Sequence, residues 1–324
     1  MNNETINEWM QEGVQLHLAG NRDEAETRYR QVLEAEEGNP VAHNNLGFLF
    51  AQNGQWKEAV EEYSRAIELS PEYSTPYTNL GQALMALNRF SEAGALLTRA
   101  VELDPDDLHA NEGMSKLCLL AGDLVSGERF LKKSYSLEPK NELLYQLILC
   151  LLGLRKNDEA REILQAIGGA GKNDVRWHNL WGLLQFAENN FGEAGLAFRR
   201  ALGFEPENTE VRNSLVAVLL KTGAREEAMT ELQRILLLAP RHLEALLNLG
   251  VLELMAADYA AALGHLDKAL EVAPGHVKGQ FYKAMALARQ KKKKVMARNL
   301  LEKVVRSKDA TYSGKAAELL EELK

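Results

Sequence analysis

Few residues in this chain could do chemistry, and their spacing fits no common catalytic or binding motif. Residues 168–173 form a glycine-rich stretch of the kind that can cradle a phosphate. A phosphate loop, however, needs glycine at Ala166, serine or threonine at Asn173 and a preceding strand. The stretch fails these requirements, and we interpret it as a structural turn.

The side chains that could bind a metal also fit no common metal-binding motif. The seven histidines never pair at a spacing typical of metal sites: His43 and His178 fall inside expected helices, and His242 and His276 fall in turns. The aspartates within residues 104–107 are too close together for a calcium loop and lack its downstream glycine and glutamate. Because no acid, base and nucleophile are grouped, we predict no catalytic residue, no metal and no cofactor, and hence no enzyme.

Composition and charge argue against further classes of protein. The chain has 324 residues, of which 46% are hydrophobic, and a formal net charge of −8. An acidic chain argues against nucleic acid as the main partner. The cysteines Cys118 and Cys150 have no metal-type spacing, and we expect both to act as small buried hydrophobes. The polar N-terminus predicts no signal peptide and the lack of a long apolar run predicts no transmembrane helix, so we expect a cytoplasmic protein.

The elements that position any functional surface are set by an internal repeat with a period of about 34 residues. Gly47 and Gly81 lie one period apart, and the prolines follow the same period in two runs. These runs are Pro71, Pro105 and Pro139, then Pro206, Pro240 and Pro274. A ladder of small residues keeps the same period at Ala25, Ala59, Ala93, Gly127, Ala160, Ala194, Ala228 and Ala262. The step from Gly127 to Ala160 is one residue shorter than the others, which predicts a residue deleted in the fifth unit.

Each period predicts two amphipathic helices joined by a short turn. The glycine near the middle of the first helix and the small residue near the start of the second let the two axes approach closely. A large side chain one helical turn after the small residue fills the seam on the same face. These side chains are Tyr29, Tyr63, Leu97, Leu131, Leu164, Phe198, Leu232 and Leu266. The proline ends the second helix because it has no N–H to donate.

This pattern resembles the tetratricopeptide repeat. The resemblance implies an all-α, right-handed superhelical solenoid of antiparallel helix pairs, with about nine repeats and a C-terminal capping helix in a single domain, residues 1–324. The expected repeats are 6–39, 40–73, 74–107, 108–141, 142–174, 175–208, 209–242, 243–276 and a degenerate 277–310, followed by a capping helix at 311–324. The glycine slot holds Ser115 in the fourth unit and Leu149 in the fifth, so we expect a bend near 142–174. The ninth unit fits only with one residue inserted near its lysine run.

The resemblance also implies a concave face, lined by the first helices, that binds a partner. Its positions are mostly polar in the second and third units: Asn44, Asn45, Thr78, Asn79 and Gln82. They are mostly apolar in later units: Leu183, Phe186, Asn248, Val251, Phe281 and Tyr282. Asn45, Asn79 and Asn248 resemble the asparagine ladder with which glycosyltransferase-linked members grip a peptide backbone. Alternatively, much of the apolar stripe is ordinary core between repeats.

We therefore expect a non-catalytic, bacterial adaptor or scaffold that binds a peptide or helix of a partner protein in this groove. Two mechanisms stay open: an extended segment held by Asn45 and Asn79, or a helix held by the apolar half. The alternatives are a regulatory or substrate-recruiting subunit of a glycosyltransferase or of a secretion or pilus-type assembly, or a self-assembling scaffold.

The C-terminal end is basic in an otherwise acidic chain. Residues 277–324 hold 13 Lys and Arg against 5 Asp and Glu. The sharpest feature is the run Lys291, Lys292, Lys293 and Lys294. A solvated run is one interpretation. The other is a docking site for an acidic partner, for an anionic membrane surface, or for another copy in a homo-oligomer.

Overall fold

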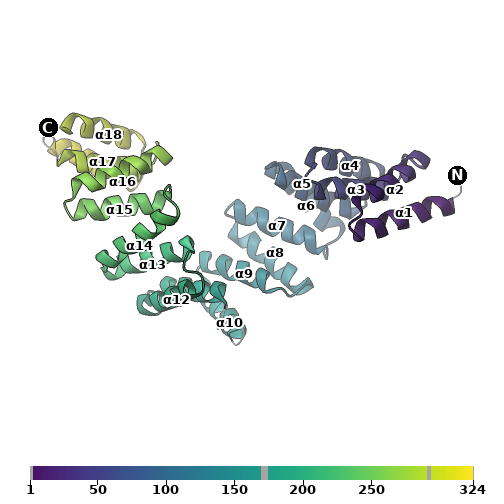
Figure 1. Cartoon of the computed structure of the whole chain (residues 1–324), viewed down its shortest axis with the longest axis horizontal. Helices are drawn as coiled ribbons and strands as arrows, with labels where there is room; N and C mark the ends of the chain where they lie inside the picture. Colours follow the sequence, from purple (N-terminus) through teal and green to yellow (C-terminus); the bar gives the residue numbers. More distant parts are fainter. Residues whose placement is uncertain (1–2, 169–173, 290–292, 324) are drawn as a thin grey trace. The chain divides into compact units, whose positions relative to one another are not determined.

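A computed structural model of the chain describes residues 3–168, 174–289 and 293–323. Over these residues it contains nineteen α-helices and no strand (Figure 1). The chain divides into two compact units, Met1–Lys156 and Asn157–Lys324. The all-helical expectation is confirmed. A single continuous solenoid and a bend near 142–174 stay predictions, although the division between the units falls inside that range.

The first unit holds nine helices within its described residues. They are α1 (Asn3–Leu18), α2 (Arg22–Ala35), α3 (Pro40–Gln52), α4 (Trp56–Leu69), α5 (Ser74–Ala86), α6 (Phe90–Leu103), α7 (Leu108–Leu120), α8 (Leu124–Leu137) and α9 (Asn141–Gly153). Consecutive helices pack against each other as hairpins, and the first helices α1, α3, α5 and α7 also contact their neighbours in turn.

The second unit repeats this arrangement. Its described helices are α10 (Asn157–Ile167), α11 (Val175–Ala187), α12 (Phe191–Phe204), α13 (Thr209–Thr222), α14 (Arg225–Leu238), α15 (Leu243–Met255), α16 (Tyr259–Val272), α17 (Val277–Ala288), α18 (Lys294–Arg306) and α19 (Ser313–Glu322). The final helix α19 packs on α18, where Ala316 completes a small core with Phe281 and Leu301.

The seam inside the hairpins that keep the glycine has the predicted close approach. A Cβ built on Gly182 would lie 2.6 Å from the ring of Phe198, and one built on Gly47 would lie 2.9 Å from the ring of Tyr63. Both rings are fully buried against the small residues of the same seam. The glycines are therefore required by the neighbouring large side chain and not by backbone conformation.

Alanine at Gly182 is expected to lower the free energy of unfolding by about 1–3 kcal/mol, because its methyl group would overlap the Phe198 ring. Gly264 in α16 is the matched control, since it is exposed in the middle of the helix and a Cβ there meets no atom within 4 Å. Alanine at Gly264 should instead stabilise by about 0.5–1 kcal/mol through helix propensity. Urea unfolding followed by circular dichroism measures the free energy of unfolding of both variants. A change in the same direction for both would contradict the tight seam.

A second repeated feature anchors the turn between repeats. The side chain of the fourth residue of the first helix reaches back to a carbonyl six residues earlier. Tyr77 donates to Pro71 O at 3.1 Å, Asn111 to Pro105 O at 3.1 Å, and Gln280 to Pro274 O at 2.8 Å. His43 contacts Glu37 O and Arg212 donates to Pro206 O in the same way. Different residue types thus satisfy the same carbonyl of the turn.

The missing residue does not lie where the small-residue ladder suggested. Helix α8 begins at Leu124 and α9 at Asn141, and this step is one residue shorter than the step from α6 at Phe90 to α7 at Leu108. The deletion therefore falls in the turn at residues 138–140, before α9 rather than within the fifth unit. As a result Ile148, which is fully buried, occupies the glycine slot, and Leu149 points to the exposed surface.

The ninth helix pair carries the predicted insertion. Helix α17 begins at Val277 and α18 at Lys294, and this step is one residue longer than the step from α15 at Leu243 to α16 at Tyr259. The spacing of the helix starts therefore agrees with one inserted residue near the lysine run.

Candidate partner-binding surface

Two adjoining hollows lie on the first-helix face of the first unit. The larger, of about 540 Å³, is lined by Glu112, Ser115, Lys116, Leu119, Leu120, Lys140, Glu142, Leu143 and Gln146. The smaller, of about 460 Å³, is lined by Gln82, Met85, Ala86, Asn88, Phe90, Glu112, Gly113, Lys116 and Leu120. Because Glu112, Lys116 and Leu120 line both, the hollows form one surface, which we call the α7 groove.

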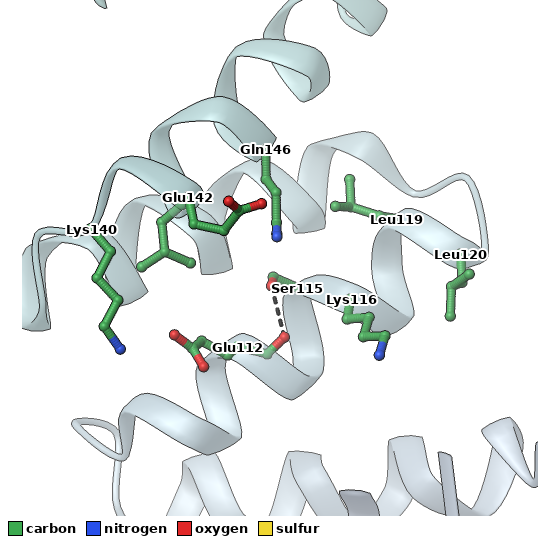
Figure 2. A pocket seen from close by; sticks show the side chains of 9 residues that line it. Glu112, Ser115, Lys116, Leu119, Leu120, Lys140, Glu142 and Gln146 are labelled. Carbon is green, nitrogen blue, oxygen red and sulfur yellow. Dashed lines mark hydrogen bonds between the residues drawn. The ribbon is translucent and has the colours of Figure 1, made fainter. Parts of the chain in front are cut away.

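The spacing of residues along α7 and α9 determines which side chains line the α7 groove. Glu112, Lys116 and Leu120 are four residues apart in α7, so they share one face of that helix. Glu142 and Gln146 share a face of α9 for the same reason. Figure 2 shows Glu112 and Lys116 on one side of the larger hollow and Glu142 and Gln146 on the opposite side. The helices α7 and α9 contact each other less than α5 and α7 do, which leaves room for the larger hollow.

Of the two lysines that line the groove, one forms an ion pair within the described part of the chain and the other does not. Lys140 forms an ion pair with Glu138 at 2.7 Å, and this hydrogen bond raises the pKa of Lys140. Ser115 donates to Glu112 O at 2.8 Å. Lys116 is exposed and makes no ion pair with another residue in the described ranges. A cation without an internal partner therefore lies between the two hollows.

The groove also exposes apolar surface. Leu120 is 63% exposed, although it ends a helix whose other apolar side chains are largely covered. Phe90, which begins α6, is exposed in the smaller hollow. Large apolar side chains exposed beside charged ones are typical of surfaces that bind protein segments.

The polar positions predicted on α3 and α5 are largely used inside the chain. Asn79 Nδ2 donates to Asn44 Oδ1 at 2.9 Å, and Asn44 Nδ2 donates to Asn45 Oδ1 at 3.4 Å. Thr78 is buried and its hydroxyl donates to Asp107 Oδ2 at 2.6 Å. Asn44 is buried too. It joins α3 to α5, and Thr78 joins α5 to the residue that caps α7, so both leave little surface for a partner. Gln82 is exposed and lines the smaller hollow.

The positions predicted in the second unit are mostly covered. Leu183 and Phe186 pack against the core formed by α11 to α15. Phe281 is buried beside Tyr312, with ring centroids 5.3 Å apart, so it is a core residue. Tyr282 is half-buried in the same core.

The remaining positions predicted to bind a partner also belong to the second unit. Asn248 accepts a hydrogen bond from Lys278 Nζ at 2.8 Å, and Val251 is half-buried. Lys291 and Lys292 lie outside the described residues. Lys293 and Lys294 are exposed at the start of α18.

Sequence reasoning missed most of the α7 groove. Lys116 and Leu120 occupy the ninth and thirteenth positions of the fourth unit, and Gln82 at the ninth position of the third unit was recognised. The same offset could have identified Lys116. Gln146 is a polar residue on the first helix of the fifth unit, which is the same signal that identified Gln82.

Cys150 is buried as expected, whereas Cys118 is only half-buried, and two of the histidines cap helices. Burial raises the pKa of the Cys118 and Cys150 thiols, and Cys150 Sγ donates to Leu124 O at 3.1 Å. His242 and His276 each cap the start of a first helix by accepting a backbone N–H. Within the described ranges, no three His, Cys, Asp or Glu side chains are grouped as metal ligands. No helix in these ranges is long and apolar enough to cross a bilayer.

Family models match most of the chain. A model of the tetratricopeptide repeat matches residues 16–66, 119–184 and 185–250, and a second matches 75–107. A third, described as a TPR repeat, matches residues 49–88. The chain belongs to the tetratricopeptide repeat family. This repeat is in general a non-catalytic module, and it supports a role as a protein-interaction scaffold.

Solved structures share this fold. A chain of the APC/C hetero-tetramer Cut9–Hcn1 aligns with 17% identity and a TM-score of 0.58 over 82% of this chain. The alignment covers 52% of that chain, so this tetratricopeptide repeat protein spans about half its length. PilF of Pseudomonas aeruginosa aligns with 21% identity and a TM-score of 0.55, over 65% of this chain and 96% of PilF. At these identities the likeness shows the fold alone. No curated protein sequence matches the chain.

Proposed function

We propose that this tetratricopeptide repeat protein is a non-catalytic scaffold that holds a polypeptide segment of a partner protein in the α7 groove. The observation that supports this most directly is the pair of adjoining hollows that share Glu112, Lys116 and Leu120. Both hollows are open to solvent and lie side by side, which suits an elongated ligand better than a small enclosed one.

The chemistry of the groove suits a polypeptide. The amides of Gln82 and Gln146 can each donate and accept, so they can bind backbone groups of any sequence. Leu120 can pack an apolar side chain, and Lys116 can pair with a carboxylate. Because Asn44 and Asn79 bind each other, we place the segment on Gln82 and α7 rather than on the asparagine ladder.

The finer parts of this proposal rest on the sequence. We propose a bacterial, cytoplasmic protein with a protein partner and no nucleic acid. The likeness to PilF is compatible with a subunit of a pilus-type assembly but does not favour it over a glycosyltransferase subunit or a self-assembling homo-oligomer.

Substitutions in the groove test the proposal. Leu120→Asp and Lys116→Glu are each expected to weaken capture of a partner by at least about tenfold, which corresponds to about 1.4 kcal/mol. The matched controls are Leu237→Asp, at an 82% exposed leucine in α14, and Lys57→Glu in α4. Affinity capture with the full chain, followed by quantitative mass spectrometry, measures recovery. Equal recovery by groove and control variants would contradict a site in the α7 groove.

A further inference from the structure

The start of α18 concentrates positive charge without a compensating carboxylate. Lys293, Lys294 and Arg298 are exposed there and make no ion pair with another described residue. The first turn of α18 contains no acidic side chain. By contrast, the first turn of α14, at the same place in the seventh hairpin, contains Glu226 and Glu227.

The helix itself adds to this charge. The N-terminus of a helix carries a partial positive charge and is normally matched by acidic side chains. In α18 it instead carries lysines, and the side chain of the N-cap residue Lys293 accepts no backbone N–H. Backbone N–H groups without a described side-chain acceptor and three exposed cations therefore lie within the first two turns of α18, an arrangement that favours an external anion such as a phosphate.

Two exposed apolar side chains lie among these cations. Val295 is 72% exposed and Met296 is 56% exposed. They are not part of the face that packs α18 into the hairpin, which consists of Ala297, Leu301 and Val304. Val295 and Met296 therefore add exposed apolar surface directly beside the cations.

We propose that the start of α18 is a docking site for the surface of an anionic lipid bilayer. Lys293, Lys294 and Arg298 bind lipid phosphates, while Val295 and Met296 enter the apolar edge of the headgroup layer. The net charge of the whole chain does not oppose this, because charges farther away than about 8–10 Å are screened at physiological ionic strength. The site is separate from the α7 groove and does not depend on it.

The apolar pair favours a bilayer over an acidic protein or the acidic part of a second copy. Charge alone would satisfy any of the three, but only a bilayer offers an apolar layer directly beneath a sheet of phosphates. In this arrangement charge and apolar surface act together. Removing the cations and removing the apolar pair should therefore each weaken binding to the bilayer.

Sedimentation of the full chain with vesicles tests the proposal. Vesicles of phosphatidylcholine mixed with phosphatidylglycerol should bind the protein at least about tenfold more tightly than vesicles of phosphatidylcholine alone. Lys293→Gln/Lys294→Gln should weaken that binding by about tenfold or more, and Val295→Asn/Met296→Gln by several-fold. Lys291 and Lys292 stay unchanged in every variant.

The matched control is Lys221→Gln/Arg225→Gln, which removes two exposed cations at the corresponding turn of the seventh hairpin. It should bind vesicles like the unaltered protein. No binding to phosphatidylglycerol vesicles, equal weakening by the control, or no effect of the apolar variant would overturn the proposal. Salt-sensitive self-association of the protein, or its binding to polyglutamate, without vesicle binding would also overturn it and would assign the cations to an acidic polypeptide.

Discussion

The variant Arg212→Ala is expected to lose about 3–5 kcal/mol in the free energy of unfolding. Arg212 and Glu231 form an ion pair in which both side chains are less than one-tenth exposed. Arg212 also donates to the carbonyl of Pro206 in the turn before α13. Removing the guanidinium leaves the buried Glu231 carboxylate with only the exposed Arg234 as a partner and the Pro206 carbonyl without this donor, and neither group can regain full hydration.

Arg234 provides the control for this prediction. It also pairs with Glu231, at 2.9 Å, but its own side chain is 59% exposed. Arg234→Ala should therefore cost no more than about 1 kcal/mol. The double variant Arg212→Met/Glu231→Leu should recover much of the loss, because no charge is then left buried. Urea unfolding measures all three, and an Arg212→Ala variant as stable as Arg234→Ala would contradict the prediction.

Leu232→Ala is expected to destabilise the second unit by about 2–5 kcal/mol. Leu232 is fully buried in the core shared by α12, α13, α14 and α15, where its truncation leaves a cavity that the packed helices cannot close. The same change at Leu237, which is 82% exposed in the same helix, should alter stability by less than about 0.5 kcal/mol. Circular dichroism against urea gives both values. Comparable losses at the two leucines would show that α14 does not pack as described.

The repeat could be predicted from the sequence because its signature residues solve a local packing problem. Gly182 and Phe198 must be small and large because two helix axes meet at that point, whatever surrounds the hairpin. The fourth residue of the first helix has no such signature, because its side chain need only reach one backbone carbonyl of the turn. His43, Asn111 and Arg212 share no chemistry beyond their ability to donate to the carbonyl six residues earlier.

The candidate site was harder to predict because it depends on contacts between repeats. Asn79 looks available to a ligand in sequence, but its amide donates to Asn44 on the preceding first helix. Thr78 is used in the same way by Asp107, the residue that caps the start of α7. The deletion in the turn at 138–140 moves Ile148 and Leu149 by one position, and a shift of one residue in a helix changes the face by about 100°.

The most direct test of the α7 groove as a binding site is to ask which side chain touches a bound partner. A photo-crosslinking amino acid is placed at Leu120 in the α7 groove and, in a second variant, at Leu237 in α14. After irradiation, mass spectrometry identifies any polypeptide joined to each position. We expect one reproducible polypeptide crosslinked at Leu120, through a single short segment, and not at Leu237. Crosslinks of equal yield at both positions, or none at Leu120 while the partner remains bound, would contradict binding in the groove.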